Sequence, residues 1–131
     1  MKELVINKCH GGFGLSHEAV LRYAELKGIT LHSKKEFSFR NYYTIPVDEF
    51  EKLHQEAKIT GNWKLINHVF FFVRDIDRDD PVLIQVVKEM GEKANDICAE
   101  LKIVQIPDDV EYEIQDYDGM ETVAEVHRKW Y

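Results

Sequence analysis

The chain has 131 residues, enough for one domain with a hydrophobic core, and 44% of them are hydrophobic. Its formal net charge of −7 argues against generic binding to DNA, RNA or an anionic membrane, because those partners attract basic faces. No apolar run reaches the roughly 18–20 residues that span a bilayer, and the first residues lack the apolar core of a signal peptide. The sequence therefore predicts a single cytoplasmic domain over residues 1–131, with neither a membrane nor a nucleic-acid polymer as partner.

Hydrophobic periodicity and turn signals divide the chain into strands and helices. Strands are predicted over residues 2–9, 29–32, 68–73, 98–106, 111–115 and 122–126, and helices over 16–27, 48–58 and 82–90. The first strand, the first helix and the second strand resemble a βαβ unit. Together these elements predict an α+β domain with about three helices on a mixed sheet of about five to six strands, followed by an irregular tail.

Local signals mark several element boundaries. Asp48 and Glu51 match a capping box at the start of the second helix, and Asp80 followed by Pro81 matches an N-cap and first helical residue for the third. The Asp118–Gly119 pair predicts a tight hairpin turn near the C-terminus. The most apolar run, over residues 68–73, predicts a central strand that is covered on both faces.

The segment over residues 33–46 is the least regular. Residues 33–36 are expected to form a polar turn. Aromatic side chains then gather around Arg40 at Phe37, Phe39, Tyr42 and Tyr43. Two interpretations are open: a half-buried loop or edge strand with aromatic anchors, or a loop whose aromatic rings and arginine stack on a planar ligand.

A glycine-rich stretch, Lys8–Ser16, joins the first strand to the first helix. Gly11, Gly12 and Gly14 let the backbone adopt positive φ and approach a partner closely. Ser16 is expected to cap the helix, whose free N–H groups and dipole favour an anion. The spacing matches neither a Walker A loop nor a dinucleotide-binding fingerprint. The stretch therefore predicts either a tight structural turn or a phosphate site.

Charged and aromatic residues could complete such a site. Lys8 can neutralise a phosphate, and His10 and the Ser16 hydroxyl can add hydrogen bonds. Arg74 and Arg78 follow the strand predicted over residues 68–73, where they either contact phosphate or pair with neighbouring aspartates. The candidate ligand-binding residues are Lys8, His10, Gly11, Gly12, Phe13, Gly14, Ser16, Arg40, Tyr42, Arg74 and Arg78.

The sequence predicts no metal site and no cofactor. The aspartates over residues 75–79 are spaced as in a calcium loop, but Asp80 replaces the required glycine and Val86 the required glutamate. Cys9 and His10 lack a second Cys/His pair at zinc-binding spacing. Cys9 and Cys98 are expected to be free thiols in a reducing compartment. No complete catalytic constellation stands out, so no catalytic residue is assigned.

Three segments carry a resemblance to a known family. They are Val5–Ser16, with its Asn-Lys-Cys-His-Gly-Gly-Phe-Gly-Leu-Ser run, Arg78–Leu83 and Ile106–Ile114. The chain resembles a family of small uncharacterised proteins from bacteriophages and prophage regions, and the resemblance covers most of its length. It implies a phage origin and transfers no catalytic residue. By analogy of size, source and ligand, it implies a protein that sequesters an immune signal such as a cyclic nucleotide or an ADP-ribose species.

These observations predict a non-enzymatic protein that binds a phosphate-bearing nucleotide, as a homo-oligomer. One alternative is an enzyme that processes a nucleotide or phosphoester with His10 as acid or base. A second alternative is a protein–protein interaction module that inhibits a host protein through its acidic face.

Overall fold

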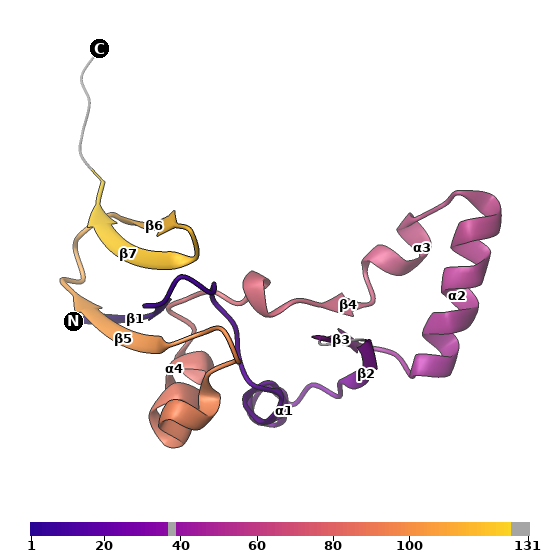
Figure 1. Ribbon diagram of the computed structural model, residues 1–131, viewed down its shortest axis with the longest axis horizontal. Helices are drawn as coiled ribbons and strands as arrows, with labels where there is room; N and C mark the ends of the chain where they lie inside the picture. Colours follow the sequence, from indigo (N-terminus) through magenta and orange to yellow (C-terminus); the bar gives the residue numbers. More distant parts are fainter. Residues whose placement is uncertain (37–38, 127–131) are drawn as a thin grey trace, which may run out of the picture. The chain divides into compact units, whose positions relative to one another are not determined.

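The computed structural model describes residues 1–36 and 39–126. The helices are α1 (His17–Lys27), α2 (Val47–Thr60), α3 (Lys64–Asn67) and α4 (Pro81–Met90), with short 3-10 turns η1 (Val73–Asp75) and η2 (Gly91–Ala94). The strands are β1 (Lys2–Asn7), β2 (His32–Glu36), β3 (Phe39–Tyr43), β4 (Phe70–Phe71), β5 (Leu101–Ile106), β6 (Tyr112–Tyr117) and β7 (Met120–Glu125) (Figure 1). The α+β class is confirmed. Phe37 and the tail over residues 127–131 lie outside the described residues.

The described strands form three small antiparallel sheets, β1-β5, β2-β3-β4 and β6-β7, where the sequence predicted one mixed sheet. β1 pairs with β5, with Lys2 opposite Ile106 and Asn7 opposite Leu101. The predicted βαβ unit is therefore wrong, because the second strand belongs to another sheet. The chain forms two compact units, Met1–Tyr23 with Ile76–Tyr131, and Ala24–Asp75.

In the first unit, the β1-β5 pair lies between the β6-β7 hairpin and α4 (Figure 1). β1 is therefore covered on both sides, and Leu4, Val5 and Ile6 are at most 3% exposed. The apolar face of α4, with Leu83 and Val86 fully buried, supplies the layer below. Burying this many large aliphatic side chains is the main stabilising contribution to the unit.

The predicted boundaries of the first unit are largely confirmed. The Asp80 side chain accepts a hydrogen bond from the Val82 N–H at 2.8 Å, with Pro81 at the first helical position of α4. Asp118 and Gly119 have φ of 50° and 89°, as a type I′ hairpin turn requires. The returning strand that the sequence predicted over residues 122–126 is β7.

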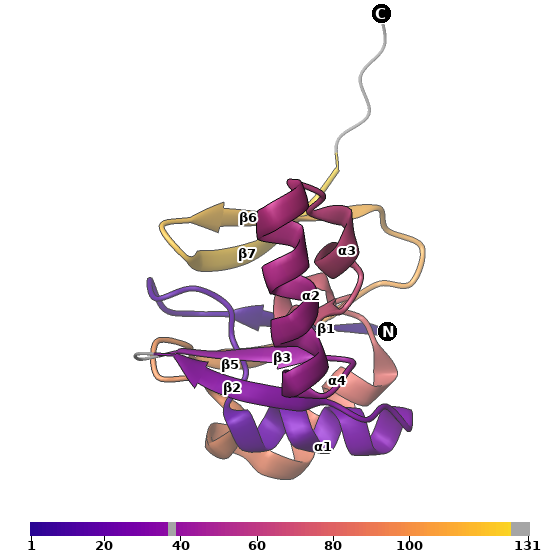
Figure 2. The same cartoon turned by 90° about the vertical axis from the view of Figure 1, so that its right-hand side faces the viewer.

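In the second unit, α2 crosses strands β2 and β3 of the β2-β3-β4 sheet (Figure 2). Tyr43 of β3 stacks on Phe50 of α2 with ring centroids 4.0 Å apart. Ile66 and Val69 complete this cluster, and all four side chains are at most 7% exposed. Tyr42 and Tyr43 are at most 8% exposed, but they lie on β3, the central strand of this sheet, and not on the half-buried loop or edge strand that the sequence offered as one interpretation.

Three boundaries in this unit differ from the prediction. α2 begins at Val47 with Pro46 as its N-cap and no side-chain cap, so the capping box at Asp48 is wrong. Residues 33–36, predicted as a polar turn, belong to β2, because cross-strand pairing with the aromatic strand β3 outweighs their own propensity. The run over residues 68–73 contributes only the edge strand β4, and the central strand is β3. Val69 instead packs into the core cluster.

No helix in the described part of the chain is long and apolar enough to cross a membrane.

Candidate functional site

The glycine-rich stretch is held in place by Asn7, the last residue of β1, which is fully buried. Its side-chain amide donates to the carbonyl oxygens of Cys9 and Gly119, each at 2.7 Å. Its side-chain oxygen accepts from the Glu100 N–H at 2.8 Å, and its own N–H donates to Glu121 Oε1 at 2.8 Å. Asn7 therefore joins the glycine stretch, the hairpin turn and the start of β5. Sequence reasoning missed it, although a polar residue at the end of an apolar strand was the available signal.

The glycines of the stretch approach other parts of the same chain. A Cβ atom at Gly11 would lie 1.9 Å from the Cys98 carbonyl oxygen, and one at Gly119 would lie 2.5 Å from the His10 carbonyl oxygen. Gly14 similarly faces the Asp96 side chain, and Gly12 has φ of 98°. These contacts account for the glycines as parts of a tight turn.

Ser16 caps α1 as predicted. Its hydroxyl oxygen accepts a hydrogen bond from the Ala19 N–H at 3.2 Å. The same hydroxyl donates to the Lys93 carbonyl oxygen at 2.6 Å. Both roles of the hydroxyl therefore stabilise the helix start and its contact with η2.

Arg78 forms a bidentate ion pair with Glu121, with nitrogen–oxygen distances of 2.5 and 2.8 Å. It also donates to the Val5 carbonyl oxygen at 3.3 Å, and its guanidinium carbon lies 3.5 Å from the centre of the Phe13 ring. Arg78 was expected to contact phosphate or a neighbouring aspartate. Its partner is instead a glutamate of β7, and it covers one face of Phe13.

Arg40, Tyr42 and Arg74 belong to the unit Ala24–Asp75. Arg40 donates to the Ser33 hydroxyl at 3.1 Å, and Tyr42 is 8% exposed. The guanidinium carbon of Arg74 lies 4.5 Å from the centre of the Phe72 ring.

Two lysine side chains meet beside the glycine-rich stretch. Lys8 continues β1, because its N–H donates to the Glu100 carbonyl oxygen at 2.8 Å. Lys102 lies on β5 opposite Ile6. A side-chain hydrogen bond with Lys8, and then the charge of Lys8, lowers the pKa of Lys102. Neither ammonium group has a carboxylate partner within residues 1–36 and 39–126.

An exposed aromatic pair lies beside the glycine-rich stretch, and one of its members, His10, is two residues after Lys8. The rings of His10 and Tyr117 meet edge to face with centroids 6.3 Å apart, and Tyr117 is 76% exposed. Lys8 and His10 are two positions apart and so link the lysine pair to this aromatic pair along the glycine-rich stretch, and we call Lys8, His10, Lys102 and Tyr117 the lysine–aromatic patch. Sequence reasoning found Lys8 and His10 but missed Lys102 and Tyr117, because only strand pairing and the hairpin bring those two residues to the glycine-rich stretch.

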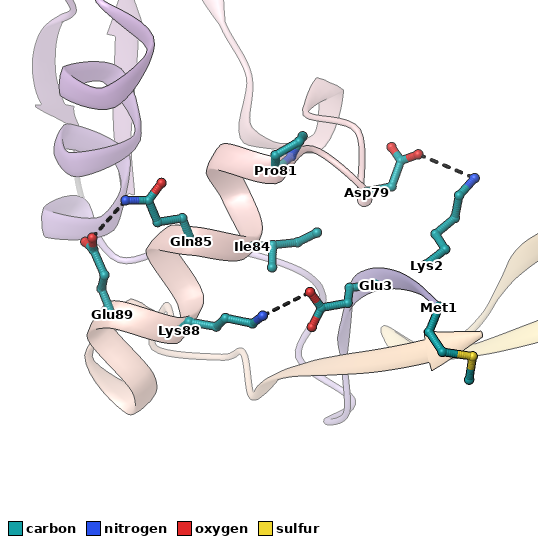
Figure 3. A pocket seen from close by; sticks show the side chains of 9 residues that line it. All are labelled: Met1, Lys2, Glu3, Asp79, Pro81, Ile84, Gln85, Lys88 and Glu89. Carbon is teal, nitrogen blue, oxygen red and sulfur yellow. Dashed lines mark hydrogen bonds and ion pairs between the residues drawn. The ribbon is translucent and has the colours of Figure 1, made fainter. Parts of the chain in front are cut away.

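A groove of about 610 Å³ lies elsewhere in the same unit, between α4 and the start of β1 (Figure 3). Pro81 and Ile84 supply apolar surface. Its charged and amide side chains pair with one another: Lys2 with Asp79 at 3.8 Å, Lys88 with Glu3 at 2.9 Å, and Gln85 with Glu89 at 3.0 Å. None of the residues predicted to bind a ligand lines this groove.

The described residues contain no cluster of three His, Cys, Asp or Glu side chains able to hold a metal ion. Comparisons of the chain with protein-family models, with curated proteins and with solved structures found no match.

Proposed function

We propose that this protein binds a small phosphate-bearing anion of the nucleotide class at the lysine–aromatic patch, without chemical turnover. The observation that carries the proposal is the placement of Lys8 and Lys102 as diagonal neighbours across the β1-β5 pair, since Lys102 lies opposite Ile6, two positions before Lys8. Both are cations, and neither has a carboxylate partner in the described chain. The chain has 24 acidic residues, so partners for these cations were available in its composition. Two adjacent ammonium groups repel each other. A phosphate bound between them would attract both groups, and these attractions would offset the repulsion.

The rest of the patch has the chemistry of a nucleotide rather than of a free phosphate. Tyr117 presents an exposed ring on which a base can stack. His10 touches that ring and is two residues from Lys8, so it can donate a hydrogen bond between base and phosphate. Arg78, Phe13 and Ser16 are left out of the proposed site, because their polar groups or ring faces are used inside the fold.

A biological role follows from the proposal combined with the family resemblance. A phage protein that retains an intact nucleotide could sequester an immune signal of its host, which places it in the host cytoplasm. This role needs binding and no catalytic group. The enzyme alternative differs in one measurable respect, because it converts the bound nucleotide.

The test is native mass spectrometry and calorimetry of the full chain with a panel of linear and cyclic nucleotides and ADP-ribose. We expect an intact nucleotide to be retained, and the Lys8→Ala and Lys102→Ala variants to lose about tenfold or more in affinity each. Lys58→Ala removes the same charge from an exposed position of α2 and is the matched control.

Three results would count against the binder. Equal affinities of the lysine variants and the control would remove the patch from the site. A change in nucleotide mass that disappears in His10→Ala would establish the enzyme instead. Retention of no nucleotide in the panel would contradict the proposed ligand class. The same spectra report the oligomer mass, which the sequence predicts to be larger than a monomer.

A further inference from the structure

The two cysteines of the chain meet at the base of the glycine-rich stretch. Cys9 and Cys98 are the only cysteines in the sequence and are 89 positions apart. The Cys9 thiol nevertheless lies 2.7 Å from the Cys98 carbonyl oxygen and donates a hydrogen bond to it. The thiols are free.

The backbone around the two residues fixes this proximity. The Lys8 N–H donates to the Glu100 carbonyl oxygen at 2.8 Å, and the Glu100 N–H donates to the side chain of buried Asn7 at 2.8 Å. A Cβ atom at Gly11 would lie only 2.5 Å from the Cβ of Cys98. The chain on either side of Cys9 therefore runs directly along the segment that carries Cys98.

The two cysteines differ in exposure. Both cysteines lie outside the regular strands, in the turn after β1 and the turn before β5. Cys98 is exposed, whereas Cys9 is half-buried. The Cys9 sulfur lies against the backbone of Cys98, and a rotation of the Cys98 side chain toward Cys9 is the movement that a disulfide between them requires.

We propose that Cys9 and Cys98 form a peroxide-reactive dithiol that closes into an intramolecular disulfide. Cys98 is the thiol attacked first, because it is the exposed one. Cys9 is the resolving thiol, because it is held beside Cys98 by the contact just described. The inference stands on this geometry alone and does not depend on the nucleotide site.

The chemistry requires a hydroperoxide as oxidant. The Cys98 thiolate attacks one peroxide oxygen, the O–O bond breaks, and Cys98 becomes a sulfenic acid as the first water or alcohol leaves. The Cys9 thiolate then attacks the sulfenic sulfur, the S–S bond forms, and the S–O bond breaks to release a second water. Two thiols thereby give two electrons and two protons to the peroxide.

The experiment uses the full chain, reduced and then treated with a stoichiometric amount of hydrogen peroxide. Remaining thiols are alkylated, and the protein is digested without reduction for peptide mass mapping. We expect a peptide pair joined through Cys9 and Cys98, in a species that migrates as a monomer on a non-reducing gel. The oxidised protein should unfold at least about 5 °C higher than the reduced protein, because the bond closes a long loop.

Single variants test the order of the steps. In Cys9→Ser, the Cys98 sulfenic acid has no resolving partner and should be trapped by dimedone. In Cys98→Ser, Cys9 should react with peroxide about tenfold more slowly, because it is less exposed. Cross-links between chains only, two separately alkylated cysteines, or faster oxidation of Cys9 than of Cys98 would each overturn the proposal.

Discussion

A single hydroxyl group, that of Tyr23, illustrates how contacts across the chain set residue properties. Tyr23 is 5% exposed, and its hydroxyl donates to Asp80 Oδ2 at 2.7 Å. Burial raises the pKa of Tyr23 well above its ordinary value, with further contributions from the hydrogen bond and the charge of Asp80. Asp80 also caps α4, so the pair joins the start of α4 to the middle of α1.

This pKa shift predicts a loss of stability in alkaline solution. A tyrosine whose pKa is raised on folding contributes its full stabilisation below the unfolded pKa, about 10, and loses that stabilisation as the pH rises further. The free energy of unfolding should therefore fall between pH 9 and pH 11 more steeply in the wild type than in Tyr23→Phe. Urea unfolding at both pH values measures the difference, and equal slopes would show that Tyr23 does not retain its proton in the fold.

Residues with local partners were predictable, and residues with distant partners were not. The Asp80 cap and the Ser16 cap follow from sequence alone, because each accepts from an N–H two or three positions away. The hydrogen bond between Asn7 and Glu121 could not be predicted, because the two residues are 114 positions apart in the sequence. The pairing of Arg78 with an aspartate nearby was one of two open interpretations, and its partner is Glu121.

At the scale of elements, the glycine-rich turn makes a sharp prediction. Gly11→Ala should destabilise the fold by more than about 3 kcal/mol, because the new Cβ would sit 1.9 Å from a backbone oxygen that cannot move freely. Gly12→Ala, in the same turn, meets no atom within 4 Å and should cost only about 1–2 kcal/mol for its positive φ. Urea denaturation of both variants provides the comparison, and a Gly11→Ala cost no larger than that of Gly12→Ala would contradict the packing.

Element prediction succeeded where pattern and packing agreed. β1, α1, α4 and the β6-β7 hairpin combine apolar periodicity with clear end signals. β2 failed because its sequence, His-Ser-Lys-Lys-Glu, is polar and takes its structure from its partner strand. The central strand predicted around β4 was wrong for the opposite reason. The apolar run there is long, but its side chains pack into a core cluster shared with helix residues, and only two residues pair as an edge strand.

At the scale of the whole molecule, the Arg78–Glu121 ion pair connects the hairpin to the rest of its unit. The two side chains are 16% and 5% exposed. Removing one partner leaves a poorly solvated charge, so Arg78→Met or Glu121→Gln should each destabilise by about 3 kcal/mol. A double-mutant cycle should give a coupling energy of about 2 kcal/mol or more.

The exposed pair Lys2–Asp79 is the matched control, with side chains 37% and 40% exposed at 3.8 Å. Its cycle should give less than about 1 kcal/mol. Similar couplings for the two pairs would mean that Arg78 and Glu121 are solvated like surface charges.

The discontinuous make-up of the first unit has a consequence for synthesis on the ribosome. The unit Ala24–Asp75 is one continuous segment, so all its partners leave the ribosome together and it can fold as it emerges. β1 emerges first, yet its pairing strand β5 and its cover β7 are among the last elements made. Leu4, Val5 and Ile6 therefore remain unpaired for most of translation, and this apolar nascent strand is exposed to aggregation until β5 and β7 have been made.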